Sequence, residues 1–247
     1  MKAMILAAGL GTRLRPLTDD RPKALVEVGG RTMLEITLTR LRAFDVREVI
    51  INVHHFAEMV IKYLEANRNF GMRIEVSREE TLLDTGGGLK KAAHFFLEGS
   101  DGSEKPFILH NVDVISAIDL GRMVQFHIEN HALATLAVQQ RQSSRQLLFD
   151  EGGKLRGRQS KSDRESPSAQ SSRGGQPLAF CGIHVLSPRF LEMMTEEGAF
   201  SIIDSYLRLA ERGEKIVAFR ADEYYWRDLG RPTDLALAAE DMKQRVF

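Results

Sequence analysis

Short apolar segments alternate with helical patterns through the first half of the chain. Strands are predicted, in chain order, at residues 4–8, 48–53, 74–76 and 107–109, and residues 24–28 alternate only weakly between apolar and polar. Between them, apolar residues recur at helical spacing in three groups, namely Leu34, Leu38 and Leu41; Phe56, Val60, Tyr63 and Leu64; and Leu89, Ala92, Ala93 and Phe96. Thr32 and Glu35 have the spacing of a capping box, which predicts that the first helix begins there.

This alternation predicts an α/β fold with a Rossmann-like, mostly parallel sheet. Strand–helix–strand units connect through right-handed crossovers, and helices then cover both faces of the sheet. Ligands bind such sheets beyond the carboxyl ends of the strands. The segments 7–23, 81–88 and 111–113 each follow a predicted strand, so we expect them to converge at one edge of the sheet.

The second half of the chain is less regular. Helices are predicted at 119–131, 201–212 and 232–245, and strands at 132–138, 179–186 and 215–221. Residues from about 157 to 176 are polar and Ser-rich and cannot bury enough apolar surface to order themselves, which predicts a mobile surface loop. No internal repeat is found, and we expect a single domain over residues 1–247.

Composition narrows the class of protein. The chain has 247 residues, of which 43% are hydrophobic, and its 34 basic and 34 acidic residues give no net charge. That balance favours neither nucleic acid nor an anionic membrane as a partner. Cys181 is the sole cysteine, so no internal disulfide can form and we interpret it as a packing residue. With no apolar stretch near the roughly 20 residues of a membrane span and no leader pattern, a cytoplasmic protein is expected.

The segment AAGLGTRLRPLTDDRPK, residues 7–23, carries the most distinctive chemistry. Gly9 and Gly11 fit two positions of a dinucleotide-binding motif, but Leu14 occupies the third, and the P-loop pattern is absent. Glycines let backbone N–H groups approach an anion, Arg13 offers a planar fork for phosphate oxygens, and Lys23 offers a mobile point charge. From the local pattern alone, a solvated loop with surface cations stays possible.

Five segments together resemble the sugar-1-phosphate nucleotidyltransferases. They are residues 7–18 with Pro22 and Lys23, residues 83–88 (LDTGGG), 111–113 (NVD), 180–186 (FCGIHVL) and 226–232 (WRDLGRP). The resemblance covers nearly the whole chain and implies the nucleotide-diphospho-sugar transferase type of fold, with the nucleotide bound by residues 1–118 and the sugar phosphate by residues 119–247. It implies transfer of a nucleoside monophosphate from a nucleoside triphosphate to a sugar 1-phosphate, with release of pyrophosphate.

The resemblance also assigns roles to residues. Arg13 would stabilise departing pyrophosphate, Lys23 would bridge the α-phosphate and the sugar phosphate, and Gly182 would let the sugar ring approach its strand. Cations at these points lower the repulsion between two phosphates, which is the main catalytic need. The nucleotide would be bound by Ala8, Gly9, Gly11, Thr12, Arg13, Gly86, Gly87 and Asn111. Residues 86–88 form the second glycine run, and the alternative interpretation of this run is a turn that leads into a helix. Val112 departs from the glycine usual in the family.

Asp113 and Asp228 are the expected metal ligands. A lone aspartate after a strand is more often a helix cap, but two at the family's positions favour a hard cation such as Mg²⁺. If both bind one magnesium ion, their carboxylates should lie within about 4 to 6 Å of each other. His127 and His131 lack the order of a zinc protease motif and are interpreted as a solvated helix face.

The sequence leaves the substrates open. The best match is UTP with N-acetylmuramate 1-phosphate, and the alternatives are GTP with mannose 1-phosphate or heptose 1-phosphate. A phosphocholine cytidylyltransferase and a non-catalytic nucleotide sensor are the other classes to consider. We expect a monomer or small homo-oligomer.

Overall fold

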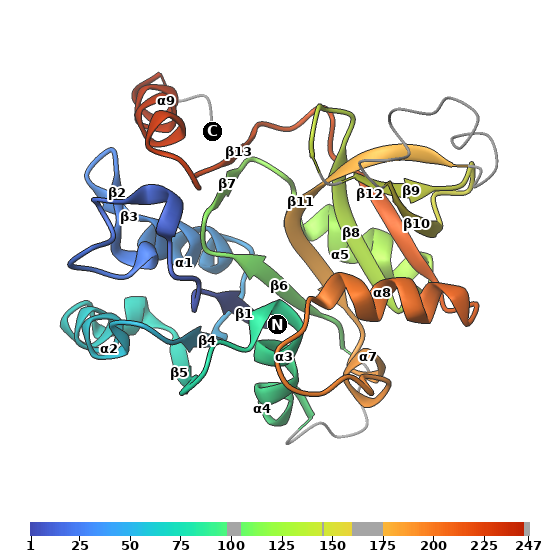
Figure 1. Ribbon diagram of the computed structural model, residues 1–247, viewed down its shortest axis with the longest axis horizontal. Coiled ribbons are helices and arrows are strands. Elements are labelled where there is room, and N and C mark those ends of the chain that lie inside the picture. Colours follow the sequence, from blue (N-terminus) through green and yellow to red (C-terminus); the bar gives the residue numbers. More distant parts are fainter. Residues whose placement is uncertain (98–104, 145, 160–174, 245–247) are drawn as a thin grey trace.

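The computed structural model describes residues 1–97, 105–144, 146–159 and 175–244 (Figure 1). The main sheet of the described chain has nine strands in the order β10-β9-β11-β6-β1-β4-β5, with β8 beside β11 and β12 beside β8. The strands are β1 (Lys2–Leu6), β4 (Glu48–Val53), β5 (Arg73–Arg78), β6 (Phe107–Asn111), β8 (Ala134–Gln139), β9 (Gln146–Phe149), β10 (Leu155–Gln159), β11 (Gln176–Leu186) and β12 (Ile216–Arg220).

The sheet is mixed and mostly parallel, as predicted. Strands β4 and β6 both run parallel to β1, β5 runs parallel to β4, and β12 runs parallel to β8. The long strand β11 is antiparallel to β6, β8 and β9, and β10 is antiparallel to β9. In the described chain only β11 and β10 therefore run against the common direction, so the carboxyl ends of the other strands point toward the same edge.

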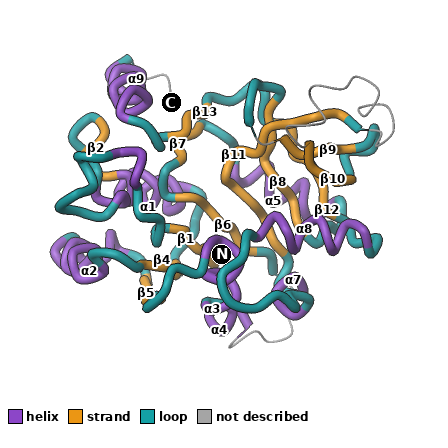
Figure 2. Tube along the Cα trace, viewed as in Figure 1, coloured by secondary structure: helices purple, strands orange, loops and turns teal. Residues whose placement is uncertain are grey.

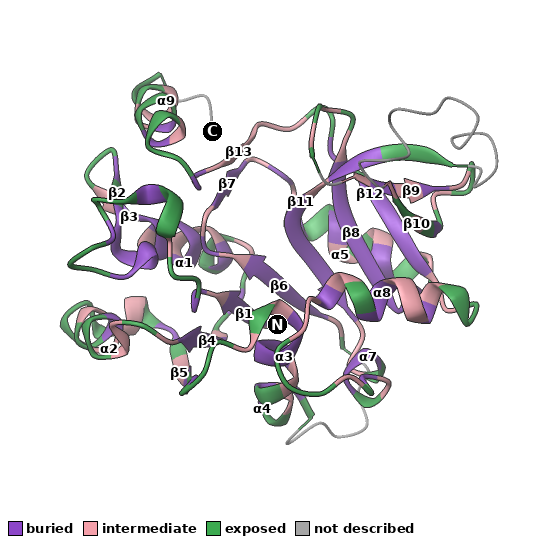
Figure 3. Ribbon diagram, in the orientation of Figure 1, coloured by how far each residue is buried: buried purple, intermediate pink, exposed green. Residues whose placement is uncertain are grey.

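Helices cover both faces of this sheet (Figure 2). They are α1 (Met33–Ala43), α2 (Ala57–Ala66), α3 (Asp84–Lys91), α4 (Ala93–Leu97), α5 (Leu120–Glu129), α7 (Arg189–Glu192), α8 (Ile202–Glu211) and α9 (Pro232–Lys243). Met4 and Ile5 are neighbours on β1 but belong to separate buried clusters, because successive strand residues face opposite sides. The central strands are accordingly buried along their length (Figure 3), which explains their uninterrupted apolar sequences.

The first helix begins where the capping pattern predicted. The Thr32 side chain accepts a hydrogen bond from the Glu35 backbone N–H at 3.0 Å and so satisfies one of the free donors of the first turn. Among the described residues no helix is long and apolar enough to cross a membrane.

Several boundaries differ from the sequence prediction. The weakly alternating residues 24–28 begin inside a 3-10 helix (Lys23–Leu25) and end in the two-residue strand β2 (Glu27–Val28), which pairs with β3 (Arg31–Thr32). The ends of the predicted mobile loop lie in strands instead, because backbone pairing with β9 extends β10 to Gln159 and begins β11 at Gln176. The remainder of that predicted loop, residues 160–174, lies outside the described residues.

The histidine interpretation is wrong for His127. Its side chain is buried rather than solvated, and its two ring nitrogens lie 2.9 Å from Thr135 Oγ1 and 3.0 Å from Ser187 Oγ. His131 lies beyond the end of α5 with a φ of 46°, so the two histidines do not share a helix face. The sequence pattern missed this because the partners of His127, Thr135 on β8 and Ser187 just after β11, lie outside the local segment.

A small second sheet brings residues 226–228 to the edge of the main sheet where β6 ends (Figure 1). Strand β13 (Trp226–Asp228) pairs antiparallel with β7 (Val114–Ser116), which follows β6 directly. In Figure 1 these two strands lie together above the carboxyl end of β6. Asp228 and Val114, which are 114 positions apart in sequence, are thereby paired directly.

Candidate active site

Three segments that each follow a strand meet beyond β1 and β6. The Val112 N–H donates to the Leu6 carbonyl at 3.1 Å, and the Leu229 N–H donates to the Asp113 carbonyl at 2.8 Å. The structure thus brings together four side chains that the sequence singled out, and we call them the charged cluster: Arg13, Lys23, Asp113 and Asp228. Two cations and two carboxylates at a sheet edge can hold anionic groups and a hard cation together.

Lys23 is fixed at the centre of the charged cluster. It begins the 3-10 helix Lys23–Leu25, and its side chain is only 10% exposed. Its ammonium group forms an ion pair with the carboxylate of Asp113, whose side chain is 19% exposed. A lysine so far buried needs a charged partner, and Asp113 supplies it. The lysine is therefore held in place before any substrate binds.

Arg13 lies exposed beside Asp228. A Cβ atom built on Gly230 would lie 2.5 Å from Arg13 Nη2 and 2.6 Å from Asp228 Oδ1, so both side chains touch the same glycine. The Gly230 N–H also donates to Asp228 Oδ1 at 2.6 Å, which fixes the carboxylate. Since any side chain at position 230 would displace both groups, the glycine of the WRDLGRP segment serves the charged cluster directly.

The pairing of β7 with β13 decides how the two aspartates meet. Asp228, the last residue of β13, pairs with Val114, the first residue of β7, and Asp113 directly precedes Val114, so the pairing brings the backbones of the two acidic residues close together. No cluster of three or more His, Cys, Asp or Glu side chains suited to a metal exists among the described residues. Two carboxylates fit magnesium, which takes its remaining ligands from phosphates and water. The shared ion and the predicted carboxylate separation stay predictions.

The first glycine loop folds back onto Lys23. Gly11 has a φ of +66°, and a Cβ atom there would lie 2.9 Å from Thr18 Cγ2 and 3.1 Å from Lys23 Cβ. The Thr18 hydroxyl donates to the Gly11 carbonyl at 2.9 Å and closes the loop. In contrast, a Cβ atom on Gly9 would meet nothing within 4 Å, which leaves the backbone open to an approaching group. Ala8 is buried and Thr12 is exposed.

The second glycine run is part of a helix and not of a loop. Gly86 and Gly87 lie in the first turn of α3, which corrects the predicted start of that helix. A Cβ atom on Gly86 would lie 2.2 Å from the Phe200 ring, and one on Gly87 would lie 2.3 Å from the Gly198 carbonyl oxygen. Close packing against residues 198–200 is thus sufficient reason for glycine here. The predicted contact with a nucleotide base stays a prediction.

A buried polar network that the sequence analysis missed joins the two glycine segments. The Asn52 side chain accepts from the Ala7 N–H at 2.7 Å and donates to Glu79 Oε1 at 2.7 Å. The second oxygen of Glu79 accepts from the Leu83 N–H at 3.0 Å. Asn52 and Glu79 are 2% and 5% exposed. Two signals in the sequence were available. Asn52 is a polar residue inside the apolar segment 48–53, and Glu79 is an acidic residue directly after the next strand.

Gly182 and Asn111 are also brought together. Gly182 has a φ of +74°, and a Cβ atom there would lie 2.9 Å from Asn111 Nδ2 and 3.0 Å from Val114 Cγ2. Asn111 Oδ1 is buried and has no hydrogen-bond partner among the described residues. The side chain of Val112, which stands where the family usually has glycine, belongs to the buried core.

Cys181 has no role as a nucleophile. Burial raises the pKa of its thiol to about 12, so the thiol stays protonated at neutral pH, and only a thiolate is an effective nucleophile. The structure agrees with the interpretation of this residue as packing, because Cys181 is fully buried in β11.

Comparison with known proteins finds similarity over nearly the whole chain. A family model described as nucleotidyl transferase matches residues 2–245. The N-acetylmuramate alpha-1-phosphate uridylyltransferase of Caulobacter vibrioides is 35% identical over 246 residues, which cover 96% of this chain and 95% of that protein. The mannose-1-phosphate guanyltransferase of Yarrowia lipolytica is 31% identical over 238 residues, which cover 95% of this chain but only 62% of that protein.

Solved structures with the same fold are more distant in sequence. HddC from Yersinia pseudotuberculosis, complexed with GMP-PN, superposes with a TM-score of 0.74 at 21% identity, over 98% of this chain and 99% of that chain. UDP-glucose pyrophosphorylase from Acinetobacter baumanii superposes with a TM-score of 0.76 at 17% identity, over 99% of this chain and 98% of that chain. At these identities the likeness establishes the fold alone.

Proposed function

The chain belongs to the nucleotidyl transferase family and is a sugar-1-phosphate nucleotidyltransferase, and we propose that it transfers UMP from UTP to N-acetylmuramate 1-phosphate with release of pyrophosphate. The observation that supports this choice most is the 35% identity to a uridylyltransferase of that specificity, which extends over 95% of the relative's length.

In the proposed reaction an oxygen of the sugar phosphate attacks the α-phosphorus of UTP. A new P–O bond forms as the bond to the bridging oxygen breaks, and pyrophosphate leaves with the electron pair of that bond. Lys23, held at the site by Asp113, would contact both the α-phosphate and the attacking phosphate. Arg13, whose guanidinium lies exposed beside Gly230, would stabilise the charge that develops on pyrophosphate.

The nucleotide would be bound by the two glycine segments. Backbone groups at Ala8, Gly9, Gly11 and Thr12 would hold the triphosphate, with Gly86, Gly87 and Asn111 toward the nucleoside. Gly182 would lie against the sugar. In this scheme residues 1–118 form the nucleotide half and residues 119–247 the sugar-phosphate half.

Enzymes of this class generally depend on a divalent metal. Asp113 and Asp228 would hold magnesium, which when bound supplies positive charge between the two phosphates. Asp113 also forms the ion pair with Lys23, so its charge would be shared between lysine and metal. Removal of either carboxylate is thus expected to lower turnover more than it lowers the stability of the fold.

GTP with mannose 1-phosphate is the second candidate pair. It is supported by the 31% identity to a mannose-1-phosphate guanyltransferase. The named relatives act on sugar phosphates, and none of these comparisons favours choline phosphate as the acceptor.

A substrate matrix tests these assignments. The purified protein is assayed with magnesium for pyrophosphate release, using four nucleoside triphosphates against N-acetylmuramate, mannose, glucose and heptose 1-phosphates. We expect the highest kcat/KM for UTP with N-acetylmuramate 1-phosphate, and the nucleotide sugar is identified by mass spectrometry. The Lys23→Ala variant gives the background. A preference for GTP with mannose 1-phosphate would replace the first candidate by the second.

A further inference from the structure

An arginine outside the charged cluster lines an open pocket beside the strand that carries Gly182. The pocket has a volume of about 780 Å³ and lies at the end of β8 against the first residues of β11. Its lining consists of Gln140, Arg141, Gln142, Ser143, Ser144, Gln146, Gln159 and Pro177. Arg141 is the one charged side chain among these described lining residues.

Arg141 is held by a stack that connects it to the proposed active site. Its guanidinium carbon lies 3.7 Å from the centre of the Trp226 ring, and its Nη2 donates to the Phe180 carbonyl at 2.8 Å. The Trp226 indole N–H in turn donates to the Cys181 carbonyl at 2.7 Å. Trp226 lies on β13 with Asp228 at the other end of the same three-residue strand. Arg141 therefore lies at the level of Gly182, on the proposed acceptor side.

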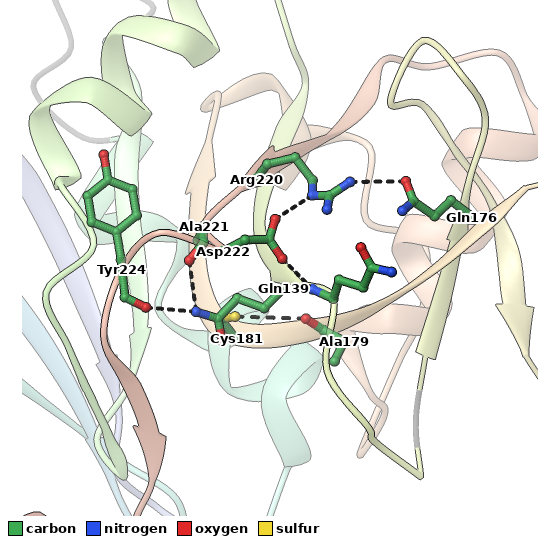
Figure 4. A network of polar contacts seen from close by, with 9 residues as sticks. Gln139, Gln176, Ala179, Cys181, Arg220, Ala221, Asp222 and Tyr224 are labelled. Atoms are coloured by element: carbon green, nitrogen blue, oxygen red, sulfur yellow. Dashed lines mark hydrogen bonds and ion pairs between the residues drawn. The ribbon is translucent and has the colours of Figure 1, made fainter.

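The backbone that leads into Arg141 is fixed as well. Figure 4 shows the Gln139 side chain donating to carbonyl oxygens of residues 221 and 224, at 2.8 and 2.9 Å. The N–H of Gln140 donates to an Asp222 carboxylate oxygen at 2.6 Å. A cation on such a rigid support loses little conformational freedom when it binds an anion.

The charge of Arg141 is not neutralised within the described chain. No described Asp or Glu forms an ion pair with it, and its buried Nε has no hydrogen-bond partner among the described residues. The neighbouring Cys181 thiol cannot serve as a counter-ion, because burial raises its pKa to about 12 despite the nearby arginine. Arg141 is only partly buried, and it is one of the residues that line the pocket. An anionic ligand group would complete this arrangement.

We propose that Arg141 binds a carboxylate carried on the sugar of the acceptor and so selects acidic sugar 1-phosphates over neutral ones. The inference rests on the proposed function, because it takes the acceptor to lie against Gly182. The phosphates of both substrates are assigned to the charged cluster, which leaves a sugar carboxylate as the anion for this pocket. N-acetylmuramate carries such a group on a lactyl ether, and N-acetylglucosamine is the same sugar without it.

The test compares these two acceptors with UTP in wild type and Arg141→Gln. Loss of one charge-assisted hydrogen bond is worth about 1.5–3 kcal/mol, so kcat/KM for N-acetylmuramate 1-phosphate should fall about 10- to 100-fold. The value for N-acetylglucosamine 1-phosphate and the KM for UTP should stay unchanged. A merely structural role would not alter the ratio between the two acceptors. Arg156→Gln is the matched control, since exposed Arg156 on β10 pairs with Asp150 at 2.7 Å and should leave the ratio unchanged.

Arg141→Lys provides a second variant if Arg141→Gln does not fold, as judged by circular dichroism and thermal unfolding. It keeps the charge but loses the planar fork, so it should retain part of the preference for the acidic acceptor. An equal loss with both acceptors, or a wild-type preference for the neutral one, would overturn the role of Arg141 and leave nucleotidyl transfer intact. Failure of wild type to release pyrophosphate with either acceptor would refute both the role and the proposed substrates.

Discussion

Gly87→Ala distinguishes packing from ligand binding as the reason for the second glycine run. The added Cβ atom would lie 2.3 Å from the Gly198 carbonyl oxygen and 3.0 Å from Leu83 Cβ. The opposing backbone cannot easily retreat, because the Gly86 N–H donates to the Phe200 carbonyl at 2.9 Å and the Phe200 N–H donates to the Leu83 carbonyl at 3.2 Å. One methyl group therefore forces α3 and the segment before α8 apart.

The magnitude follows from two opposing effects. Overpacking costs about 1–3 kcal/mol, and contact with a backbone atom puts this case near the upper end. Alanine in place of glycine within a helix returns about 1 kcal/mol. The variant should thus lose about 2 kcal/mol of unfolding free energy. At about 2–4 °C per kcal/mol for a protein of this size, Tm should fall by about 4–8 °C.

Thermal unfolding by calorimetry measures this effect, with Gly121→Ala as the control. Gly121 is an exposed helical glycine of α5 whose added Cβ atom would lie 3.3 Å from Asp119 Oδ1, so its Tm should be unchanged or slightly raised. The KM for the nucleoside triphosphate is measured on the same samples. A Gly87→Ala protein with wild-type Tm and a raised nucleotide KM would refute the packing argument and favour contact with the base.

Three further predictions concern catalysis and pH. Arg13→Ala should lower kcat by about 10²- to 10³-fold in the pyrophosphate assay with little change in Tm, because its side chain is exposed and its charge is needed on the leaving group; near-normal turnover would exclude that role. Asp113→Ala and Asp228→Ala should each abolish magnesium-dependent turnover while circular dichroism stays native, whereas full activity in either variant would end the shared-metal assignment. Burial lowers the pKa of His110 and His184 from 6.5 to about 4 and about 3, so below pH 6.5 the unfolded chain takes up protons that the native state does not. The unfolding free energy from urea titration should accordingly fall from pH 7.5 to pH 5 by about 2 kcal/mol per histidine, and equal values at the two pH values would contradict this.

Much of the charged cluster could be predicted from sequence because its members belong to local patterns. A glycine-rich turn after an apolar strand, with Arg13 and Lys23 close behind it, indicates an anion site through the chemistry of those residues alone. The alternation of strands and helices likewise predicted that such segments would converge. Asn52 and Glu79 escaped notice because a polar residue in a strand acquires meaning only from its partner on another strand.

Local sequence determined where the main strands and helices of the first half form, because the apolar period and capping residues act within a few positions. It determined the chemical types available at the sheet edge for the same reason. Only the tertiary structure decided which distant groups meet: the β7–β13 pairing sets Asp228 beside Val114 and Asp113, and the stack on Trp226 sets Arg141 beside β11. The tertiary structure also decided that Gly86 and Gly87 pack under residues 198–200. These contacts join segments that are far apart in the sequence. They form because those segments pack together in the folded protein, and a pattern within a few neighbouring residues carries no information about that packing.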